Sequence, residues 1–265
     1  MRDLYSHRFT LPNGVTVCIP SEKGRERGKE IAQDVADRWS PKGNYFHQLE
    51  GGHIAAARRH HASTVIAKLD LAKFYHQVGR SKVHRALKLI GMTQKDAWEA
   101  ACDSTVERDP GLRNFSLPFG YVQSPILASI VLDYSALGTA IAQLNTGGCL
   151  VSAYVDDIIV SADDADTVNN AVDQLRAAAG VSGFAINEKK SEGPAADITA
   201  FNIHLGNGRM EITAKRMGEF EAATRDAYPE RIMGILNYVN SVNAGQMEAL
   251  AAKIEWPEGN PLTAA

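Results

Sequence analysis

The sequence predicts an α+β fold of the split βαβ type, built around a hairpin that carries two adjacent aspartates. A buried strand, Thr64–Leu69, ends at an aspartate, and two further apolar strands, Cys149–Val155 and Ile158–Ser161, flank the Asp-Asp pair. Helical patterns lie between and after these strands. The sequence contains neither GxxxxGK[ST] nor GxGxxG, so neither a P-loop nor a dinucleotide-binding site is predicted.

The N-terminal third is predicted to form a basic lobe. Arg8–Ile19 indicates two short strands around a Pro-Asn-Gly turn, Ser21–Glu30 indicates a mobile tip or a helix entry, and Ser81–Ile90 has helical periodicity. Residues 1–95 hold 17 Lys and Arg against 8 Asp and Glu, whereas the rest hold 11 against 23. This division suits a phosphate-binding lobe beside a carboxylate site, and a solvated basic surface accounts for it equally well.

The remainder of the chain is predicted to alternate helices with short strands. A helix is expected from Ser124, followed by a second with an apolar stripe over residues 164–179. Short strands follow near Phe184–Ile186 and Ile198–Leu205. Residues 213–254 indicate two or three short helices.

Composition favours a cytoplasmic protein that does not enter a membrane. Its 265 residues are 45% hydrophobic and 22% charged, its apolar runs are too short to span a bilayer, and its N-terminus has no signal-peptide core. Cys18, Cys102 and Cys149 are widely spaced, which favours free thiols over a disulfide framework or a zinc site.

Asp156 and Asp157 would place two carboxylates between apolar strands, which is unfavourable unless a cation is bound. Adjacent residues of an extended chain point to opposite faces, so only one of them can aim directly at a metal. Aspartate is common in turns, and the pair alone favours a surface turn. Asp70 lies at the end of another apolar strand. With this third carboxylate a metal site is favoured over a surface turn, because three carboxylates can bind two Mg²⁺ ions ~4 Å apart. A site without His or Cys suits Mg²⁺ better than zinc.

Four motifs, in order, resemble those of reverse transcriptases. They are Lys68–Tyr75 (KLDLAKFY, the first palm motif), Leu117–Pro125 (LPFGYVQSP, resembling LPQGxxxSP), Tyr154–Asp157 (YVDD, the YxDD box) and Gly183–Ser191 (GFAINEKKS, resembling GxxxNxxK). Ile198–Gly206 falls where the primer-grip hairpin of this family belongs. The GGHIAAARRHH approach to the first motif looks most like bacterial retron and phage-defence members.

The resemblance implies a right-hand polymerase palm of split βαβ, ferredoxin-like type, with fingers and a reduced helical thumb. We expect fingers over residues 1–62, a palm over 63–206 with an inserted fingers segment at about 81–116, and a reduced helical thumb or C-terminal segment over 207–265.

The resemblance also assigns roles. Asp70 and Asp156 would hold both metals, with the Leu71 carbonyl as a further ligand, and Asp157 would support them. Lys190 would stabilise or protonate pyrophosphate, although an exposed lysine on a polar turn is an alternative. Tyr75 falls where the family has an aromatic steric gate that favours dNTPs, with a core aromatic as its alternative.

Substrate contacts are expected from Phe119, Gly120 and Gln123. Phe119 replaces the usual glutamine of LPQG, which puts ordinary base selection in doubt. A basic run could grip the triphosphate or could simply be solvated; its members are Lys23, Arg25, Arg27 and Lys29.

These features predict an RNA-directed DNA polymerase that uses dNTPs and two Mg²⁺ ions, with Mn²⁺ as a substitute. Its expected partners are an RNA template and a nucleic-acid primer, and further candidates are a dedicated structured non-coding RNA, a protein partner or a second copy. The family suggests a retron-like or anti-phage role. The alternatives are a non-templated or protein-assisted DNA polymerase, an RNA-dependent RNA polymerase, which Tyr75 argues against, and a non-catalytic nucleic-acid-binding scaffold.

Overall fold

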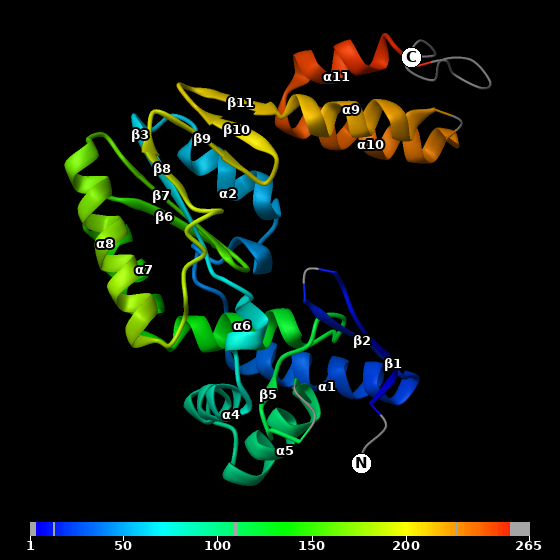
Figure 1. The fold of residues 1–265 in the computed structure, drawn as a ribbon, viewed down its shortest axis with the longest axis vertical. Coiled ribbons are helices and arrows are strands. Elements are labelled where there is room, and N and C mark those ends of the chain that lie inside the picture. Colours follow the sequence, from blue (N-terminus) through cyan, green and yellow to red (C-terminus); the bar gives the residue numbers. More distant parts are fainter. Residues whose placement is uncertain (1–3, 13, 109–110, 226, 255–265) are drawn as a thin grey trace.

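The structure is a computed structural model and describes residues 4–12, 14–108, 111–225 and 227–254. A four-stranded antiparallel sheet in the order β6-β7-β3-β8 lies at its centre (Figure 1). Its strands are β3 (Val65–Asp70), β6 (Leu150–Tyr154), β7 (Asp157–Ala162) and β8 (Glu192–Ala195). The predicted α+β architecture is confirmed, including the two apolar strands around the Asp-Asp pair.

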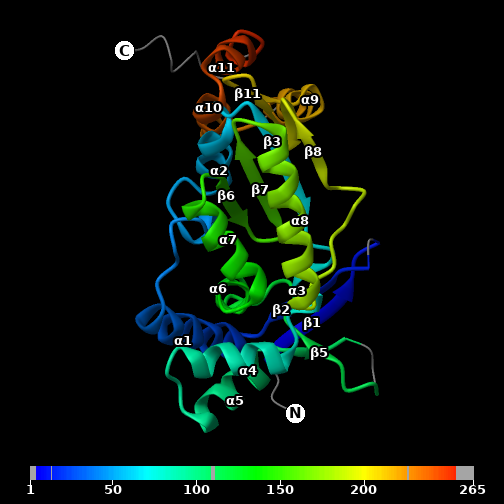
Figure 2. The ribbon, with the colours of Figure 1, turned by 90° about the vertical axis from the view of Figure 1, so that its left-hand side faces the viewer.

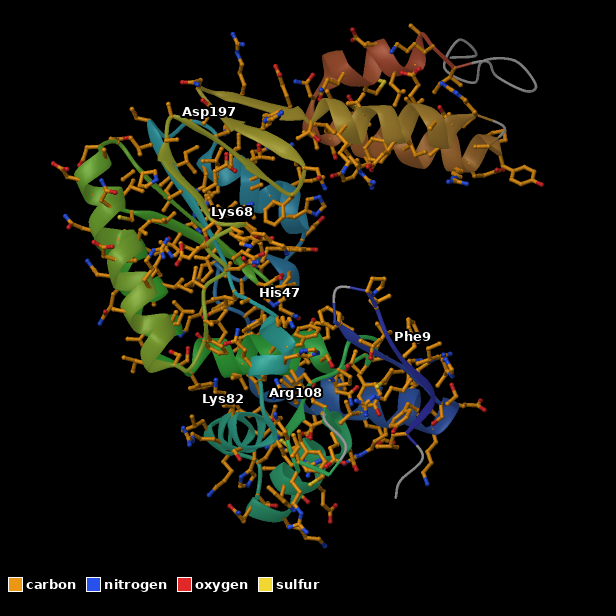
Figure 3. All side chains as sticks on the ribbon, in the orientation of Figure 1. Phe9, His47, Lys68, Lys82, Arg108 and Asp197 are labelled. Carbon is orange, nitrogen blue, oxygen red and sulfur yellow. The ribbon has the colours of Figure 1, made fainter. Side chains whose placement is uncertain are left out.

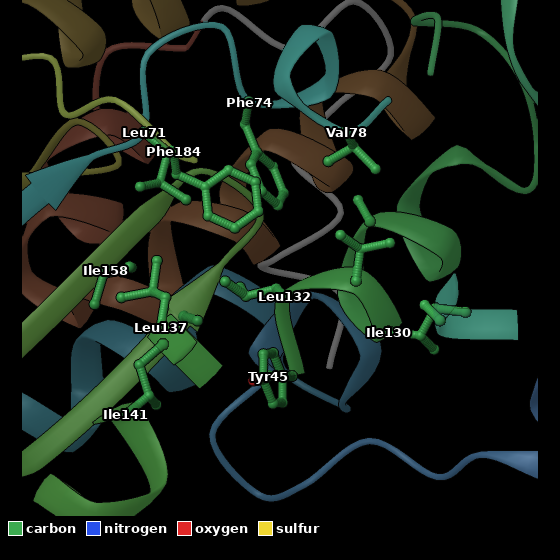
Figure 4. Packing of buried hydrophobic residues seen from close by; sticks show 14 of the residues in the cluster. Tyr45, Leu71, Phe74, Val78, Ile130, Leu132, Leu137, Ile141, Ile158 and Phe184 are labelled. Carbon is green, nitrogen blue, oxygen red and sulfur yellow. The ribbon is translucent and has the colours of Figure 1, made fainter. Parts of the chain in front are cut away.

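Two helices, α7 (Ala136–Thr146) and α8 (Ala165–Val181), cover one face of this sheet (Figure 2). Side chains alternate along a strand, so every second residue of β3 and β7, such as Leu69 and Ile158, points to these helices and joins the main core. Figure 4 shows this core, in which Phe184 also packs.

The other face of the sheet packs against α2 (Gly52–His60) and a second, three-stranded sheet. Ile66 and Ile159 point this way and form a separate apolar cluster with α2 and the second sheet. Its strands are β9 (Asp197–Ala200), β10 (Ile203–Gly206) and β11 (Arg209–Ile212). The expected strand near residues 198–205 is therefore a hairpin.

The N-terminal hairpin lies beside helices from two parts of the chain (Figure 1). Ser21 caps α1 by accepting a hydrogen bond from the Gly24 N–H, so the basic stretch Ser21–Glu30 enters a helix and is not a loop tip. The elements are β1 (Tyr5–Thr10), β2 (Thr16–Pro20), α1 (Glu22–Arg38), α3 (Phe74–Gln77), α4 (Arg80–Leu89), α5 (Gln94–Ser104), β4 (Val106–Glu107), β5 (Phe115–Ser116) and α6 (Ser124–Asp133).

The segment before β3 packs against the central sheet. The 3-10 turn η1 (Phe46–Gln48) and α2 both lie against this sheet, and His60 of α2 is fully buried between side chains of β6 and β7. Ala57 of α2 also joins the apolar cluster on this face of the sheet.

The C-terminal helices α9 (Ala214–Thr224), α10 (Pro229–Val242) and α11 (Ala244–Ala251) form their own apolar cluster around Phe220, Leu236 and Leu250. Pro229 begins α10, because the fixed φ and missing N–H of proline suit the first turn of a helix. In the described part of the chain no single helix could cross a membrane; only α6 and α7 taken together, bent by 69°, reach the required length and composition.

Candidate active site

The central sheet brings the aspartates of two distant segments together at one end of its two inner strands, β3 and β7. Asp70 ends β3 and pairs directly with Asp157, the first residue of β7. Directly opposed residues of antiparallel strands project side chains from the same face. The Leu71 N–H donates to the carbonyl of Asp156 at 2.7 Å, which ties the end of β3 to the hairpin turn.

The turn itself has an unusual backbone. Val155 and Asp156 form a two-residue turn between the paired residues Tyr154 and Asp157. Val155 has a φ of +57°. Two-residue hairpin turns favour glycine or asparagine at positive φ, and a β-branched residue there costs about 1–3 kcal/mol. Packing around the hairpin therefore imposes this conformation.

The carboxylates of the turn destabilise one another. Burial raises the pKa of Asp157 to about 7, and the charge of Asp156 adds to this effect while Lys68 opposes it. Burial also raises the pKa of Asp156, with the charge of Asp70 adding to it. A cation bound here would relieve this repulsion.

The motif around Lys190 wraps the end of β3. The Lys190 Nζ lies 3.5 Å from Asp70 Oδ2, and its side chain is largely exposed. The Asn187 N–H donates to the Asp70 carbonyl at 2.8 Å, and the Asp70 N–H donates to Ser191 Oγ at 3.2 Å. The structure thus places Lys190 beside the aspartates, with most of its side chain in solvent.

The donor set fits a divalent cation that binds together with its substrate. Among the residues that the structure describes, no group of three or more His, Cys, Asp or Glu side chains forms a ready-made metal cage. Mg²⁺ does not need one, since it keeps several waters and is held by one or two carboxylates plus substrate phosphates. Asp70 and Asp156, which repel each other, are such carboxylates.

Tyr75 and Phe119 form a ring pair next to the aspartates. Their ring centroids are 4.7 Å apart with an interplanar angle of 41°. Tyr75 is 7% exposed and Phe119 is 36% exposed, so Phe119 covers the outer side of the pair. Burial, followed by the charge of Asp156, raises the pKa of Tyr75 to about 12, which keeps its hydroxyl protonated.

The backbone of the LPFG segment is held against β2. The Cys18 N–H donates to the Phe119 carbonyl at 2.9 Å, and the Phe119 N–H donates to Thr16 O at 3.4 Å. Gly120 has a φ of +98°, and a Cβ at this position would lie 2.3 Å from Cys18 O. Gly120 therefore permits the close approach that orients Phe119.

Gln123, from which a substrate contact is expected, is buried between two helices. It is 2% exposed, and its Nε2 donates to Ser104 Oγ at 3.3 Å. A Cβ on Gly28 would lie 2.4 Å from its Oε1, so the side chain fills the contact between α1 and α5. The cause is the start of α6 at Ser124, for which Gln123 is the N-cap and from which it turns into the fingers core.

The basic run in α1 is not gathered at the aspartates either. Arg27 forms ion pairs with Asp103 and Glu30, both at 3.0 Å. The remaining members, Lys23, Arg25 and Lys29, lie exposed on the same helix. A solvated helix surface describes this run better than a triphosphate grip.

Two histidines contact the hairpin that carries Asp156, the fully buried His60 and the half-buried His47, and no local sequence pattern predicts these contacts. His60 Nδ1 and Nε2 lie 2.7 and 2.9 Å from Ser161 Oγ and Ser152 Oγ. His47 Nδ1 accepts a hydrogen bond from the Val155 N–H at 3.2 Å, beside the hairpin tip (Figure 3). Partners this far apart in the sequence leave no periodic signal.

Comparisons with known proteins agree with this geometry. A family model described as reverse transcriptase (RNA-dependent DNA polymerase) matches residues 17–202. The chain is 25% identical over 224 residues to the Retron Ec86 reverse transcriptase of Escherichia coli, covering 79% of this chain and 67% of that protein.

A solved telomerase from Candida albicans, in complex with a fragment of telomeric RNA, has a TM-score of 0.51 at 9% identity. The match covers 89% of this chain and 53% of that one, so this chain spans about half of the telomerase, and the likeness is one of fold. Reverse transcriptases generally use divalent metal ions. Since the family model matches more than half of its residues, this chain belongs to the reverse transcriptase family of RNA-directed DNA polymerases, which are nucleotidyltransferases.

Proposed function

We propose that the chain extends a nucleic-acid 3′ end with dNTPs, copying RNA, by a two-Mg²⁺ mechanism. The observation that supports this most directly is the pairing of Asp70 with Asp157 together with the Leu71–Asp156 hydrogen bond. These contacts gather carboxylates of the first motif and of the YVDD turn at one edge of the sheet.

Asp70 and Asp156 would hold the metal ions, with the Leu71 carbonyl as a further ligand, and Asp157 would support them electrostatically. Metal ions held by these residues would supply the Lewis-acid chemistry that favours attack of a 3′-hydroxyl on an α-phosphate and offsets the charge of the leaving pyrophosphate. Lys190 carries a mobile positive charge beside Asp70 and could follow that pyrophosphate. Mn²⁺ offers similar oxygen coordination and is the expected substitute.

Tyr75 is the group expected to select the sugar. Its ring is held on one side by Phe119 and lies close enough to Asp156 for that charge to raise its pKa. A ring beneath the sugar leaves no room for a 2′-hydroxyl, which favours dNTPs. An RNA-dependent RNA polymerase would instead prefer rNTPs.

An RNA template and a nucleic-acid primer are the proposed partners. The thumb contains three short helices in the described chain, so a structured non-coding RNA, a protein partner or a second copy could help to hold the duplex. A retron-like, anti-phage role in the cytoplasm is the proposed setting, suggested by the similarity to a retron enzyme.

The direct test is dNTP incorporation on a primed RNA template with Mg²⁺. Asp156→Ala and Asp157→Ala are expected to abolish incorporation while the circular dichroism spectrum stays unchanged. Asp163→Ala, an exposed aspartate just beyond β7, serves as the matched control and should remain active. Incorporation by the purified Asp156→Ala, Asp157→Ala double variant would refute the assignment.

Synthesis without a conventional template is a second candidate, favoured by the apolar Phe119 where the family has glutamine. Sequencing the products made with and without RNA separates the two. Products complementary to the supplied RNA support templated synthesis, whereas identical products in both reactions support the alternative. Nucleic-acid binding without any Mg²⁺-dependent turnover would indicate a scaffold.

A further inference from the structure

The strained turn of the YVDD hairpin is tied to a single side chain. Val155 holds a φ of +57°, which a β-branched residue rarely adopts. Its N–H donates to Nδ1 of His47 at 3.2 Å. On the other side of the turn, the Asp156 carbonyl accepts from the Leu71 N–H. The two turn residues are therefore held from opposite sides.

The hydrogen bonds of His47 fix its tautomer and its orientation. Because Nδ1 accepts from Val155, the ring proton lies on Nε2, which donates to Ser129 Oγ at 2.6 Å. The Ser129 hydroxyl donates in turn to the Pro125 carbonyl at 2.8 Å. A continuous chain of hydrogen bonds thus connects the turn to α6, with each group donating toward α6: Val155 to His47, His47 to Ser129, and Ser129 to the Pro125 carbonyl. Burial lowers the pKa of His47 to about 4, which favours this neutral form.

The segment that carries His47 is itself attached to the edge of the sheet. The Ala153 N–H donates to Asn44 O at 2.7 Å, and Tyr45, fully buried, forms a parallel bridge with Ala153. The His47 ring also packs edge-on against Tyr154 at a centroid distance of 6.0 Å. The imidazole is consequently a rigid support for the turn.

We propose that His47 is a positioning residue for the polymerase reaction, holding the Val155 peptide at positive φ and thereby setting the direction of the Asp156 carboxylate. This inference rests on the proposed function. His47 is not proposed to touch the substrate or a metal ion. It acts through the backbone of the turn, and its removal would allow Val155 to relax toward a negative φ.

The decisive experiment combines His47→Ala with Val155→Gly. His47→Ala is expected to lower the incorporation rate by roughly tenfold to a hundredfold, the loss typical of a misplaced catalytic group. It should also raise the Mg²⁺ concentration needed for half-maximal rate. Glycine adopts positive φ without steric penalty, so Val155→Gly should restore much of the rate in the double variant. His47→Asn, which retains an acceptor near the Nδ1 position, should lose less than His47→Ala.

His60→Ala provides the control, since His60 is fully buried and hydrogen-bonds β6 and β7 away from the turn. It should lose stability, and Val155→Gly should not rescue it. A folded His47→Ala with wild-type rate and Mg²⁺ dependence would overturn the inference, as would a double variant no better than His47→Ala.

A second readout keeps this inference separate from the proposed function. Amide hydrogen exchange at Val155 should be slow in the wild type and at least tenfold faster in His47→Ala, as expected when a protecting hydrogen bond is lost. A wild type that incorporates no nucleotide would refute the polymerase assignment alone. Unchanged exchange at Val155 would refute the role of His47 even in an active enzyme.

Discussion

Phe119 stands where the resembled LPQG motif has glutamine, and its ring contact with Tyr75 suggests what this difference does. Phe119 restricts Tyr75 from the exposed side at a centroid distance of 4.7 Å. We expect Phe119→Ala to free the Tyr75 ring and to lower the preference for dNTPs over rNTPs roughly tenfold, about 1.4 kcal/mol of discrimination. The measurement is the ratio of kcat/KM for dTTP and UTP.

If Phe119 acts through Tyr75, the Tyr75→Ala, Phe119→Ala double variant should discriminate no worse than Tyr75→Ala alone. Phe9→Ala, which removes an exposed aromatic ring from β1, is the control and should leave the ratio unchanged. An unchanged ratio in Phe119→Ala would show that the ring pair does not govern sugar selection.

The buried carboxylate of Asp157 is expected to lower the stability of the protein when no metal ion is bound. Its pKa is raised from the ordinary 3.8 to about 7 by burial and the charge of Asp156. A group whose pKa is raised on folding stabilises the protein at low pH and loses that contribution as the pH rises through the folded value. Asp157→Asn should therefore raise the Tm at pH 8 without metal by roughly 2–4 °C, the shift expected for about 1 kcal/mol.

This gain from Asp157→Asn should shrink below pH 5, where the wild-type carboxyl is already protonated. Added Mg²⁺ should stabilise the wild type more than the variant, because the ion relieves the repulsion that the amide lacks. A variant less stable than wild type at pH 8 would contradict this account.

At the scale of elements, α2 supports the hairpin through His60, which hydrogen-bonds Ser152 of β6 and Ser161 of β7. Burial, with the charge of Arg59 adding, lowers the pKa of His60 from 6.5 to about 3. The unfolded chain therefore binds a proton below pH 6.5 that the folded chain does not, and stability falls as the pH drops through this range. His60→Gln keeps a polar side chain but cannot titrate.

We expect the free energy of unfolding of His60→Gln to depend less on pH between 5 and 6.5, by up to ~1.4 kcal/mol per pH unit. Urea unfolding at several pH values measures this slope. His61→Gln, on the exposed end of the same helix, is the control. Equal slopes for wild type and His60→Gln would exclude the buried His60 as the source of acid sensitivity.

The elements that the sequence could predict are those with local signals. The apolar strands around Asp156 and the helix that begins at Ser124 follow from periodicity, although the N-cap of α6 is Gln123 and not Ser124. The register that pairs Asp70 with Asp157 comes from the folded sheet. The burial of Gln123 could not be predicted, because its motif position does not reveal which way the start of α6 turns the side chain. His47 was missed because its contact with Val155 spans distant residues and depends on the folded turn.

At the scale of the whole molecule, the C-terminal helices α9, α10 and α11 lie beyond the second sheet, at the end away from α1, α4 and α5 (Figure 1). An aromatic cluster joins these helices, the expected thumb, to the central sheet: His53 of α2 lies between Tyr154 of the YVDD motif and Tyr238 of α10. Phe201, in the β9–β10 turn, packs against both His53 and Tyr154. His53 Nε2 lies 3.1 Å from the Tyr238 hydroxyl. Thumb and catalytic hairpin thus share one set of contacts.

Loosening this cluster should therefore reduce processivity more than the chemistry of a single addition. Tyr238→Ala removes the ring that connects α10 to His53, and we expect the number of nucleotides added per binding event to fall about threefold or more, as for a lost aromatic contact of ~0.5–1.5 kcal/mol. Product lengths under a heparin trap measure this, and single-nucleotide addition should stay close to wild type.

Tyr238→Phe retains the ring and should show a smaller loss. Tyr228→Ala, which alters an exposed thumb residue, is the control. If Tyr238→Ala slows the first addition as strongly as the later ones, the cluster supports the hairpin itself and does not act through the thumb.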